Sequence, residues 1–549
     1  MIGIDSLRLD RTKMGGYKYN TCPALYEMAL NGVNCINAVT NSGPTQFAYP
    51  SIVSSSNPLD YGGYDDGVID RPDIISEVFS QLGYETFSFG ADCWISEPNG
   101  YKRGFNSFEN IFDIDTIWKN AEIYLSHYRR LLNHKLVSKK EYIDLNFNFL
   151  EKHIRQTIDY CCEELANESL NKEKYRDLYP YNFSFVKKVF EQELNSLMKD
   201  KEFYINSLKK INDINSFFDI GDFIRIYNKS YFGILFFLIN KHEFIRNVFY
   251  KIRNRLYKNF TTSNYMTSKF LKWLNESKTQ PFFASIFYGD THDLVCSEGM
   301  KNSYRSGLNN LMSEIDRPER FTFTERVMPS SPEMNDALYD ASIKFIDNNI
   351  AKIISYLKLN NLLDSTLIVL YSDHGTDLNF KNSSRDLTAS FYDEYIRVPM
   401  VYYSPQIESK EITSNVTLSD IGPTLLDLIG ERKRMLWNGL PVYSENVSDR
   451  EYVMLENMGK GPCDILRKPI NIAIRNKNWK LIFCESSAGI CETLHLVELY
   501  DLNNDPKELN NLAKVLDYNN MVNELMNVSI KRCKEIRVAY NKLHFSFKA

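Results

Sequence analysis

The sequence predicts an α/β fold in which helices sandwich a mainly parallel central sheet, as in the alternating architectures of large globular domains. Short, continuous apolar segments occur along the 549-residue chain, and such segments are typical of strands buried on both faces of a parallel sheet. They alternate with segments whose apolar residues recur at helical spacing. An apolar fraction of 43% is sufficient for a large buried core.

The predicted elements follow one another in a regular order. Residues 1–5 (MIGID) indicate the end of a buried strand, and residues 21–32 (TCPALYEMALNG) indicate a helix that stops at a glycine. The segment 75–90 indicates a helix, then a glycine, then a strand. The same pattern predicts strands over 281–289, 365–373 and 397–405, and helices over 332–358 and 419–430.

Two regions depart from this alternation. Residues from about 115 to 262 are charged, tyrosine-rich and helical in pattern, which indicates a helical insertion. Residues 470–485 alternate like exposed antiparallel strands, and residues 498–513 indicate a turn followed by a helix. We therefore predict a main domain over 1–430, interrupted by the insertion, and a small C-terminal α+β subdomain over 431–549.

Composition excludes several classes of protein. With 65 basic and 70 acidic residues the net charge is −5, which gives no strong field for nucleic acid or an anionic membrane. The ten cysteines contain no C-x-x-C pair, so reduced cysteines in the cytoplasm are the expectation. The most apolar run, residues 231–239, is too short to span a bilayer. The first strand is cut short at Met1, which leaves open an upstream signal or anchor.

Candidate metal ligands follow three of the predicted strands. Asp5 follows the first apolar strand, Asp373 and His374 follow the apolar residues 365–372 (STLIVLYS), and His292 follows the strand 281–289. Ligands bind at the carboxyl ends of strands in parallel α/β sheets. Carboxylates with one imidazole suit a hard divalent ion such as Mg, Mn or Ca, and Zn is also possible.

Each of these residues also has a simpler interpretation when it is taken alone. Asp5 is compatible with a cap or turn, an Asp-His-Gly sequence with an ordinary loop, and His292 with a structural or surface histidine. Thr45, which follows Gly43 and Pro44 and precedes a predicted helix, is compatible with a helix cap. Only the order and flanking residues of the whole set favour a shared site.

The flanking residues resemble those of a known family. The chain is similar to the sulfatase-like branch of the alkaline phosphatase superfamily at both ends, whereas the predicted insertion has no counterpart. The segments that carry the resemblance are IDSLRLD, GPTQFAYPSIVSSSNPLDYGG, LGYETFSFG, FFASIFYGDTHD, LIVLYSDHGTDL, YDEYIRVPMVYYSP, SDIGPTLLDLIG and ELYDLNNDPKELNNLA. Their shared order along the chain makes the resemblance specific.

The resemblance implies a role for each candidate. Asp5, Asp373 and His374 would be metal ligands, Thr45 would be both nucleophile and ligand, and His292 would hydrogen-bond the substrate or assist the leaving group. The N-terminus of a helix favours an anion, and metal coordination activates a hydroxyl. The implied cofactor is therefore one divalent ion.

The sequence departs from the family at several positions. Sulfatases convert a cysteine or serine to formylglycine within C/S-x-P-x-R, where this chain has Thr45, Phe47 and Tyr49. Threonine cannot form that aldehyde, so no formylglycine is expected and the threonine-nucleophile branch is favoured. The family's basic anion-binding residues fall on Ala91 and Cys93 and near Thr388, and its second aspartate falls on Ser6. Trp94 and Lys102 lie nearby in sequence and could line the pocket, but roles in packing and at the surface are favoured for them.

These observations predict a metal-dependent hydrolase or transferase that acts on phosphate esters, or on sulfate esters, through Thr45. The expected substrates are small-molecule, glycan or lipid head-group esters. Two rival functions stay open: a true sulfatase that works without formylglycine, and a non-catalytic binding protein on a sulfatase scaffold.

Overall fold

The computed structural model describes residues 1–90, 92, 94–110, 124–125, 127–168, 183–207, 263–276, 281–292, 313–315, 332–378, 391–459, 461–485 and 496–545. Contacts divide the chain into two compact units, one formed by Met1–Ile111 with Thr261–Ala549 and the other by Phe112–Phe260. The boundaries predicted at 115, 262 and 430 stay predictions.

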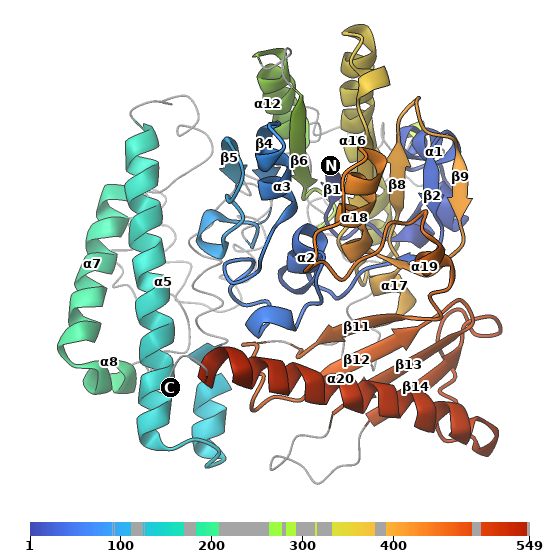
Figure 1. Ribbon diagram of the computed structural model, residues 1–549. Helices are drawn as coiled ribbons and strands as arrows, with labels where there is room; N and C mark the ends of the chain where they lie inside the picture. Colours follow the sequence, from blue (N-terminus) through green and yellow to red (C-terminus); the bar gives the residue numbers. More distant parts are fainter. Residues whose placement is uncertain are drawn as a thin grey trace. The chain divides into compact units, whose positions relative to one another are not determined.

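An eight-stranded sheet with the order β5-β4-β6-β1-β7-β8-β2-β9 forms the centre of the first unit (Figure 1). Its strands are β1 (Ile2–Ile4), β2 (Val33–Cys35), β4 (Glu85–Gly90), β5 (Ser107–Asn110), β6 (Phe282–Tyr288), β7 (Ile368–Ser372), β8 (Met400–Tyr403) and β9 (Lys410–Ile412). All neighbours from β5 to β7 are parallel, whereas β8 is antiparallel to both β7 and β2. The predicted mainly parallel sheet is confirmed. Two short parallel strands, β3 (Ala38–Val39) and β10 (Val416–Thr417), pair with each other separately.

Helices bury both faces of this sheet. One face belongs to a core with α1 (Pro23–Leu30), α12 (Ser263–Glu276) and α16 (Pro332–Leu359), and the other to a core with α2 (Thr45–Ser54), α3 (Ile75–Gln81) and α18 (Ile421–Leu428). Along β7, Ile368 and Leu370 join the first core, and Val369 and Tyr371 join the second. Because successive strand side chains point to opposite faces, a strand buried on both sides must be apolar throughout.

A four-stranded antiparallel sheet follows in the C-terminal part of the same unit. Its order is β11 (Val453–Asn457), β12 (Asn471–Arg475), β13 (Trp479–Cys484) and β14 (Leu496–Asp501), and the long helix α20 (Asn519–Phe545) packs on β12 and β13 (Figure 1). The antiparallel strands within 470–485 are confirmed, but the expectation that they are exposed is wrong. Ile472 and Phe483 join the core with α20, whereas Ala473 and Ile482 join a core with Phe391 on the opposite face.

The helix predicted within residues 498–513 is also wrong. Residues up to Asp501 belong to β14, and turns follow until a short 3-10 helix at Leu516–Tyr518. The Asp501 carboxylate accepts the backbone N–H groups of Asn503 and Asn504, and the Asn511 side chain accepts the N–H of Leu499. Asp and Asn side chains that bind the nearby backbone compete with helix formation.

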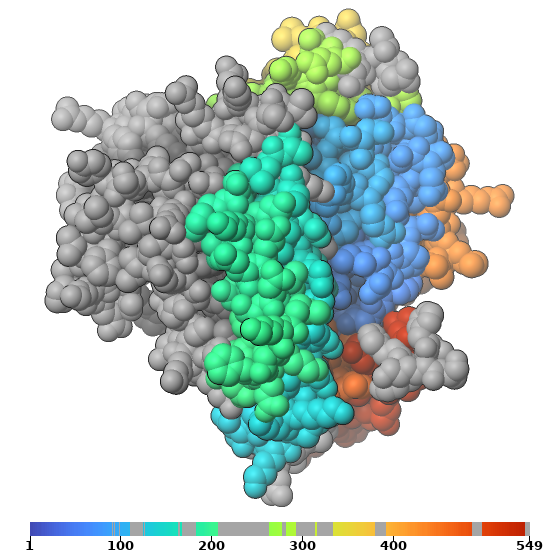
Figure 2. Space-filling model, turned by 90° about the vertical axis from the view of Figure 1, so that its left-hand side faces the viewer, coloured from blue at the N-terminus to red at the C-terminus, as the bar shows by residue number. Residues whose placement is uncertain are grey.

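The second unit contains the helices α5 (Lys139–Glu168), α7 (Phe183–Lys199) and α8 (Lys201–Ser207). Figures 1 and 2 show α5 and α7 lying side by side. Their facing sides share an apolar core that includes Tyr142, Leu150 and Phe190, which is the amphipathic arrangement expected of paired helices.

None of the helices that the structure describes combines the length and apolar character needed to cross a membrane. The described cysteines are all free thiols. The cytoplasmic location inferred from cysteine usage stays a prediction.

Candidate active site

Two buried aspartates reach one edge of the sheet from neighbouring strands. Gly3 of β1 pairs with Tyr371 of β7, and Asp5 and Asp373 each follow two residues later. Because β1 and β7 are parallel, equal offsets from one register pair place the two residues side by side at the carboxyl ends of the strands. The exposed fraction is 2% for Asp5 and 0% for Asp373.

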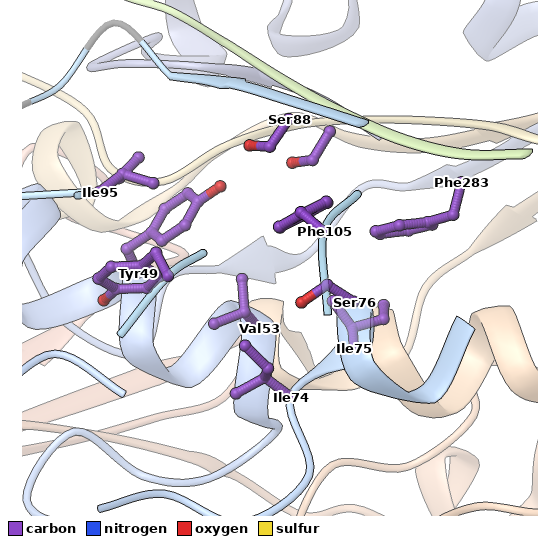
Figure 3. Close-up of a pocket in the computed structure, with 11 residues that line it drawn as sticks. Tyr49, Val53, Ile74, Ile75, Ser76, Ser88, Ile95, Phe105 and Phe283 are labelled. Atoms are coloured by element: carbon purple, nitrogen blue, oxygen red, sulfur yellow. The ribbon is translucent and has the colours of Figure 1, made fainter. Parts of the chain in front are cut away.

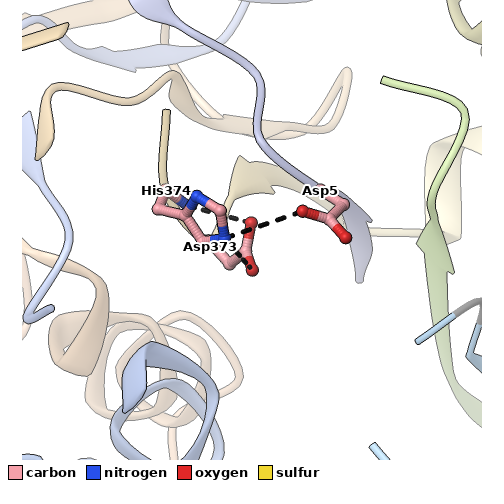
Figure 4. Close-up of side chains that lie close together, drawn as sticks. All are labelled: Asp5, Asp373 and His374. Atoms are coloured by element: carbon pink, nitrogen blue, oxygen red, sulfur yellow. Dashed lines mark hydrogen bonds and ion pairs between the residues drawn. The ribbon is translucent and has the colours of Figure 1, made fainter. Parts of the chain in front are cut away.

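His374 completes a cluster with these two aspartates (Figure 4). Its Nε2 atom lies 3.7 Å from Oδ1 of Asp5 and 3.5 Å from Oδ2 of Asp373. Its Nδ1 atom lies 2.6 Å from the carbonyl oxygen of Gly375. A carbonyl only accepts, so Nδ1 donates and Nε2 carries the lone pair. A lone pair directed at two carboxylates is the orientation of a metal-binding imidazole.

The charges of the cluster fit a divalent cation. Burial raises the pKa of Asp5 to about 7, and the negative charges of Asp373 and Asp92 also raise it, whereas His292 and His374 lower it. The Oδ2 atom of Asp373 is buried and has no hydrogen-bond partner in the part of the chain that the structure describes. Two buried carboxylates with an unsatisfied oxygen are unfavourable without a cation. Oxygen ligands with one imidazole match Mg, Mn or Ca, and also accommodate Zn.

Thr45 brings a hydroxyl to the same cluster. It is the first residue of α2, is 2% exposed, and its Oγ1 atom lies 3.2 Å from Nε2 of His374. Pro44 caps the helix with extended backbone, and its carbonyl accepts the N–H groups of Phe47 and Ala48. The N–H groups of the first turn that precede Phe47 have no partner within the helix, so this end of α2 favours an anion.

Hydrogen bonds between the loops that follow β1 and β7 hold these two strand ends together. Ser6, in the left-handed region with φ 60°, donates its hydroxyl to Oδ1 of Asp5 at 2.7 Å and its N–H to Oδ1 of Asp373 at 3.2 Å. The hydroxyl of Ser372 accepts the N–H of Leu7 and donates to the carbonyl of His374. Ser6, at the family's second aspartate position, therefore orients the first aspartate.

Gly375 allows the helix α17 (Asp393–Ile396) to pack directly behind His374. A Cβ atom at Gly375 would lie 2.0 Å from the carbonyl oxygen of Glu394, and the Gly375 N–H donates to the carbonyl of Tyr395 at 2.6 Å. Arg8 spans the same region, because it donates to the carbonyl of Thr376 and pairs with Glu394. Close backbone contact here requires a glycine.

His292 lies on the turn that follows β6, and its side chain is exposed. His292 lowers the pKa of both Asp5 and Asp92, so it acts on the cluster electrostatically. The structure therefore brings four of the predicted residues into one buried cluster: Asp5, Asp373, His374 and Thr45. His292 is exposed and acts on this cluster through its electrostatic effect on Asp5.

Asp92 is a residue that the sequence analysis missed. It follows β4 by two residues, its charge raises the pKa of Asp5, and the charge of Asp373 raises the pKa of Asp92 itself. The strand-end rule that selected Asp5 would also have selected Asp92. Lys102 is exposed and pairs with Glu97, whereas Ala91, Cys93 and Thr388 lie outside the described residues.

A small internal cavity lies in the core rather than at this cluster (Figure 3). It lies among side chains of α2, α3 and β6, including Tyr49, Val53, Ile75 and Phe283, and none of the predicted site residues lines it. It is a packing void.

The fold and the cluster define a class of protein: a helix-covered α/β sheet with a buried Asp-Asp-His group beside a hydroxyl at a helix N-terminus. The chain belongs to the sulfatase family, whose profile matches residues 1–160 and 165–431. A second profile, "N-sulphoglucosamine sulphohydrolase, C-terminal", matches residues 388–535. The resemblance to sulfatase-like proteins is thereby confirmed at the level of the family.

Curated relatives match over part of their length. The chain is 25% identical over 323 residues to the ulvan-active sulfatase of Formosa agariphila, covering 47% of this chain and 52% of that protein. It is 30% identical over 181 residues to the choline-sulfatase of Rhizobium meliloti, covering 32% of each chain. The chain thus spans about half of the first relative's length and about a third of the second's.

Solved structures match over nearly the whole chain. The phosphonate monoester hydrolase of Agrobacterium radiobacter has a TM-score of 0.53 at 14% identity, covering 98% of this chain and 95% of that one. A 2-O GAG sulfatase has a TM-score of 0.53 at 14% identity, covering 97% and 91%. At these identities the similarity establishes the fold, which is that of the sulfatases.

Proposed function

We propose that this chain is a divalent-metal-dependent enzyme that cleaves or transfers phosphate or sulfate esters, with Thr45 as its nucleophile. One observation carries the proposal: the Thr45 hydroxyl lies 3.2 Å from Nε2 of His374, within the buried cluster of Asp5, Asp373 and His374. A nucleophile, a set of metal ligands and a helix N-terminus then share one location.

The residues of the chain divide the chemistry among them. Asp5, Asp373 and His374 would hold the cation, which when bound would acidify the Thr45 hydroxyl and offset charge on the reacting group. The first turn of α2 orients an oxygen of the phosphoryl or sulfuryl group toward backbone N–H groups. His292, on the exposed side of the cluster, would hydrogen-bond the substrate or donate a proton to the leaving oxygen.

The proposed reaction has two displacements. The Oγ1 atom of Thr45 loses its proton and bonds to phosphorus or sulfur, while the bond to the leaving oxygen breaks and that oxygen takes up a proton. Water or an alcohol then attacks the same atom, the bond to Thr45 breaks, and the threonine hydroxyl recovers a proton. Water gives hydrolysis and an alcohol gives transfer.

A sulfatase that works without formylglycine is the second candidate. Family membership favours it, and the curated relatives named above are sulfatases. Thr45 at the nucleophile position favours a phosphoester, because threonine does not yield the aldehyde of formylglycine. Small-molecule, glycan and lipid head-group esters are all proposed substrates.

Two measurements test the proposal together. Turnover of an aryl phosphodiester and an aryl sulfate is compared with Mn²⁺, Mg²⁺, Ca²⁺ or Zn²⁺ added to chelator-treated protein. Rapid quenching followed by peptide mass analysis should then place a phosphoryl or sulfuryl group on Thr45. Turnover without any label on Thr45, or with a label on another residue, would refute the threonine nucleophile. Absence of both turnover and divalent-ion binding would instead favour a non-catalytic binding protein.

A further inference from the structure

A third carboxylate stands on the same edge of the sheet as the two proposed metal ligands. Gly90 of β4 pairs with Phe287 of β6, which pairs with Gly3 of β1, which pairs with Tyr371 of β7. These four residues form one register row across parallel strands. Asp92 lies two residues beyond this row, as do Asp5 and Asp373. Parallel strands with equal offsets place all three aspartates at the carboxyl ends of the strands.

The spacing of the strands places Asp92 beside the reacting centre rather than within the ligand set. β6 lies between β4 and β1, so Asp92 is two strands from Asp5, which is about 10 Å at the usual strand separation. His292 follows the intervening strand. Asp92 therefore lies on the side of the cluster where His292 is exposed.

No lysine or arginine neutralises the Asp92 carboxylate within the part of the chain that the structure describes. Its Oδ1 atom accepts the N–H of Trp94 at 2.6 Å. A negative charge on Asp92 raises the pKa of Asp5, in keeping with its position on the same register row. Burial raises the pKa of Asp92, and the negative charge of Asp373 raises it further. The hydrogen bond from the Trp94 N–H lowers this pKa, as do His292 and His374.

A negative charge at this position distinguishes esters by their charge. A sulfate monoester or a phosphodiester presents a reacting group with one negative charge. A phosphate monoester carries close to two negative charges when the pH is above its second pKa of about 6. An ionised Asp92 repels each additional negative charge on the substrate. The repulsion is stronger than in bulk water, because the effective dielectric constant of a protein site is lower. The family's basic residues would have the opposite effect, and in this chain Ala91 and Cys93 occupy their positions.

We propose that Asp92 is a specificity-determining residue that favours esters whose reacting group carries one negative charge over dianionic phosphate monoesters. This inference rests on the proposed function, because it assumes that the Asp5–Asp373–His374 cluster binds the reacting group. It narrows the substrate class to phosphodiesters and sulfate monoesters.

The test compares the wild type with Asp92→Asn at pH 8, using an aryl phosphodiester, an aryl sulfate and an aryl phosphate monoester. For each protein the ratio of kcat/KM for the diester to kcat/KM for the monoester is measured. This ratio does not depend on the fraction of correctly folded enzyme, so a structural loss cancels. Glu97→Gln is the matched control, because it removes a carboxylate from the same connecting segment that already pairs with Lys102.

Asp92→Asn should lower the diester-to-monoester ratio about tenfold, through a gain for the dianion, as expected for one charge at this range. Glu97→Gln should leave the ratio within about twofold, because exposed paired charges contribute little. If the wild type turns over the diester but Asp92→Asn leaves the ratio unchanged or raises it, the role of Asp92 is refuted while the proposed function stands. If the wild type turns over none of the three esters, the proposed function itself fails.

Discussion

The hydroxyl oxygen of Thr45 lies 3.2 Å from Nε2 of His374, although 329 positions separate the two residues in the chain. Thr45 enters the site from the first turn of α2, and His374 enters it from the loop after β7. The two elements meet because both Val369 of β7 and Tyr49 of α2 belong to the same core under the sheet. The contact joins the proposed nucleophile to the proposed metal ligands.

Thr45→Ala should abolish turnover while leaving the fold intact. The substitution removes the attacking oxygen, so kcat should fall by about a thousandfold or more. Within the part of the chain that the structure describes, the substitution removes one side-chain hydrogen bond, which costs about 1 kcal/mol of unfolding free energy. Steady-state kinetics and urea denaturation measure the two effects. Thr45→Ser keeps an oxygen at the same position and should retain measurable activity; equal activity of Thr45→Ala and wild type would exclude Thr45 as nucleophile.

Divalent-ion binding should stabilise the wild type and should be lost in Asp373→Asn. At a hundredfold excess over Kd, the ion should add about 3 kcal/mol to the unfolding free energy. Asparagine retains an oxygen that can accept the N–H groups of Ser6 and His374, but it removes one of two buried charges. The ion-free variant should therefore be at least as stable as the ion-free wild type. Thermal melts with and without ion test both statements, and an undiminished ion-induced shift in the variant would contradict the assigned ligand set.

Lys480→Met should destabilise the C-terminal sheet strongly. Lys480 is fully buried and its Nζ atom lies 2.7 Å from Asp393, 2.5 Å from Glu508 and 2.8 Å from the carbonyl oxygen of Phe391. Removing one partner of a buried ion pair costs about 3 to 5 kcal/mol, because charge is left uncompensated. Urea denaturation measures the loss.

Lys102→Met is the matched control, because Lys102 lies at the surface, and it should change the free energy of unfolding by less than about 0.5 kcal/mol. Adding Glu508→Gln to Lys480→Met removes one of the uncompensated carboxylates and should recover part of the loss. A loss in Lys480→Met no greater than in the control would show that the buried cluster does not hold the sheet in place.

Stability of the helical unit should fall as the pH decreases from 6.5 to 4. His153 lies in α5, its Nδ1 atom donates to the carbonyl of Phe149 at 2.8 Å, and burial lowers its pKa from 6.5 to about 4. In this pH range the unfolded state binds a proton that the folded state does not, so folding weakens with acidity by up to about tenfold per pH unit. Above pH 6.5 the contribution is complete.

Hydrogen exchange of the α5 amides, corrected for the intrinsic effect of pH, measures this dependence. His153→Phe removes the titrating group and retains an aromatic ring beside Phe149, which the imidazole contacts with a centroid distance of 4.0 Å. The variant should therefore show a flatter pH profile. Identical profiles for the two proteins would mean that His153 stays accessible to protons in the folded state.

The amino-acid sequence alone determined the type and approximate position of several of the main elements. Strands such as β6 and β7 are continuous apolar runs, and helices such as α1 and α16 carry apolar residues at helical spacing, so local pattern and burial agree. It failed at residues 498–513, where the chain forms β14 and then turns, and the Asp501 side chain binds the nearby backbone in competition with the expected helix. It also failed for β12, because an alternating pattern does not reveal that a second layer covers the outer face.

Only the tertiary structure decided how distant residues combine. An apolar strand has the same sequence pattern whether it runs parallel or antiparallel, so the reversed direction of β8 follows from its neighbours. Likewise, the register of the parallel strands places Asp92 at the same edge of the sheet as Asp5 and Asp373. The packing of α2 on the sheet places the Thr45 hydroxyl next to His374. Residue types and their order specify the candidate groups, but their distances depend on contacts between segments hundreds of positions apart, which no local pattern encodes.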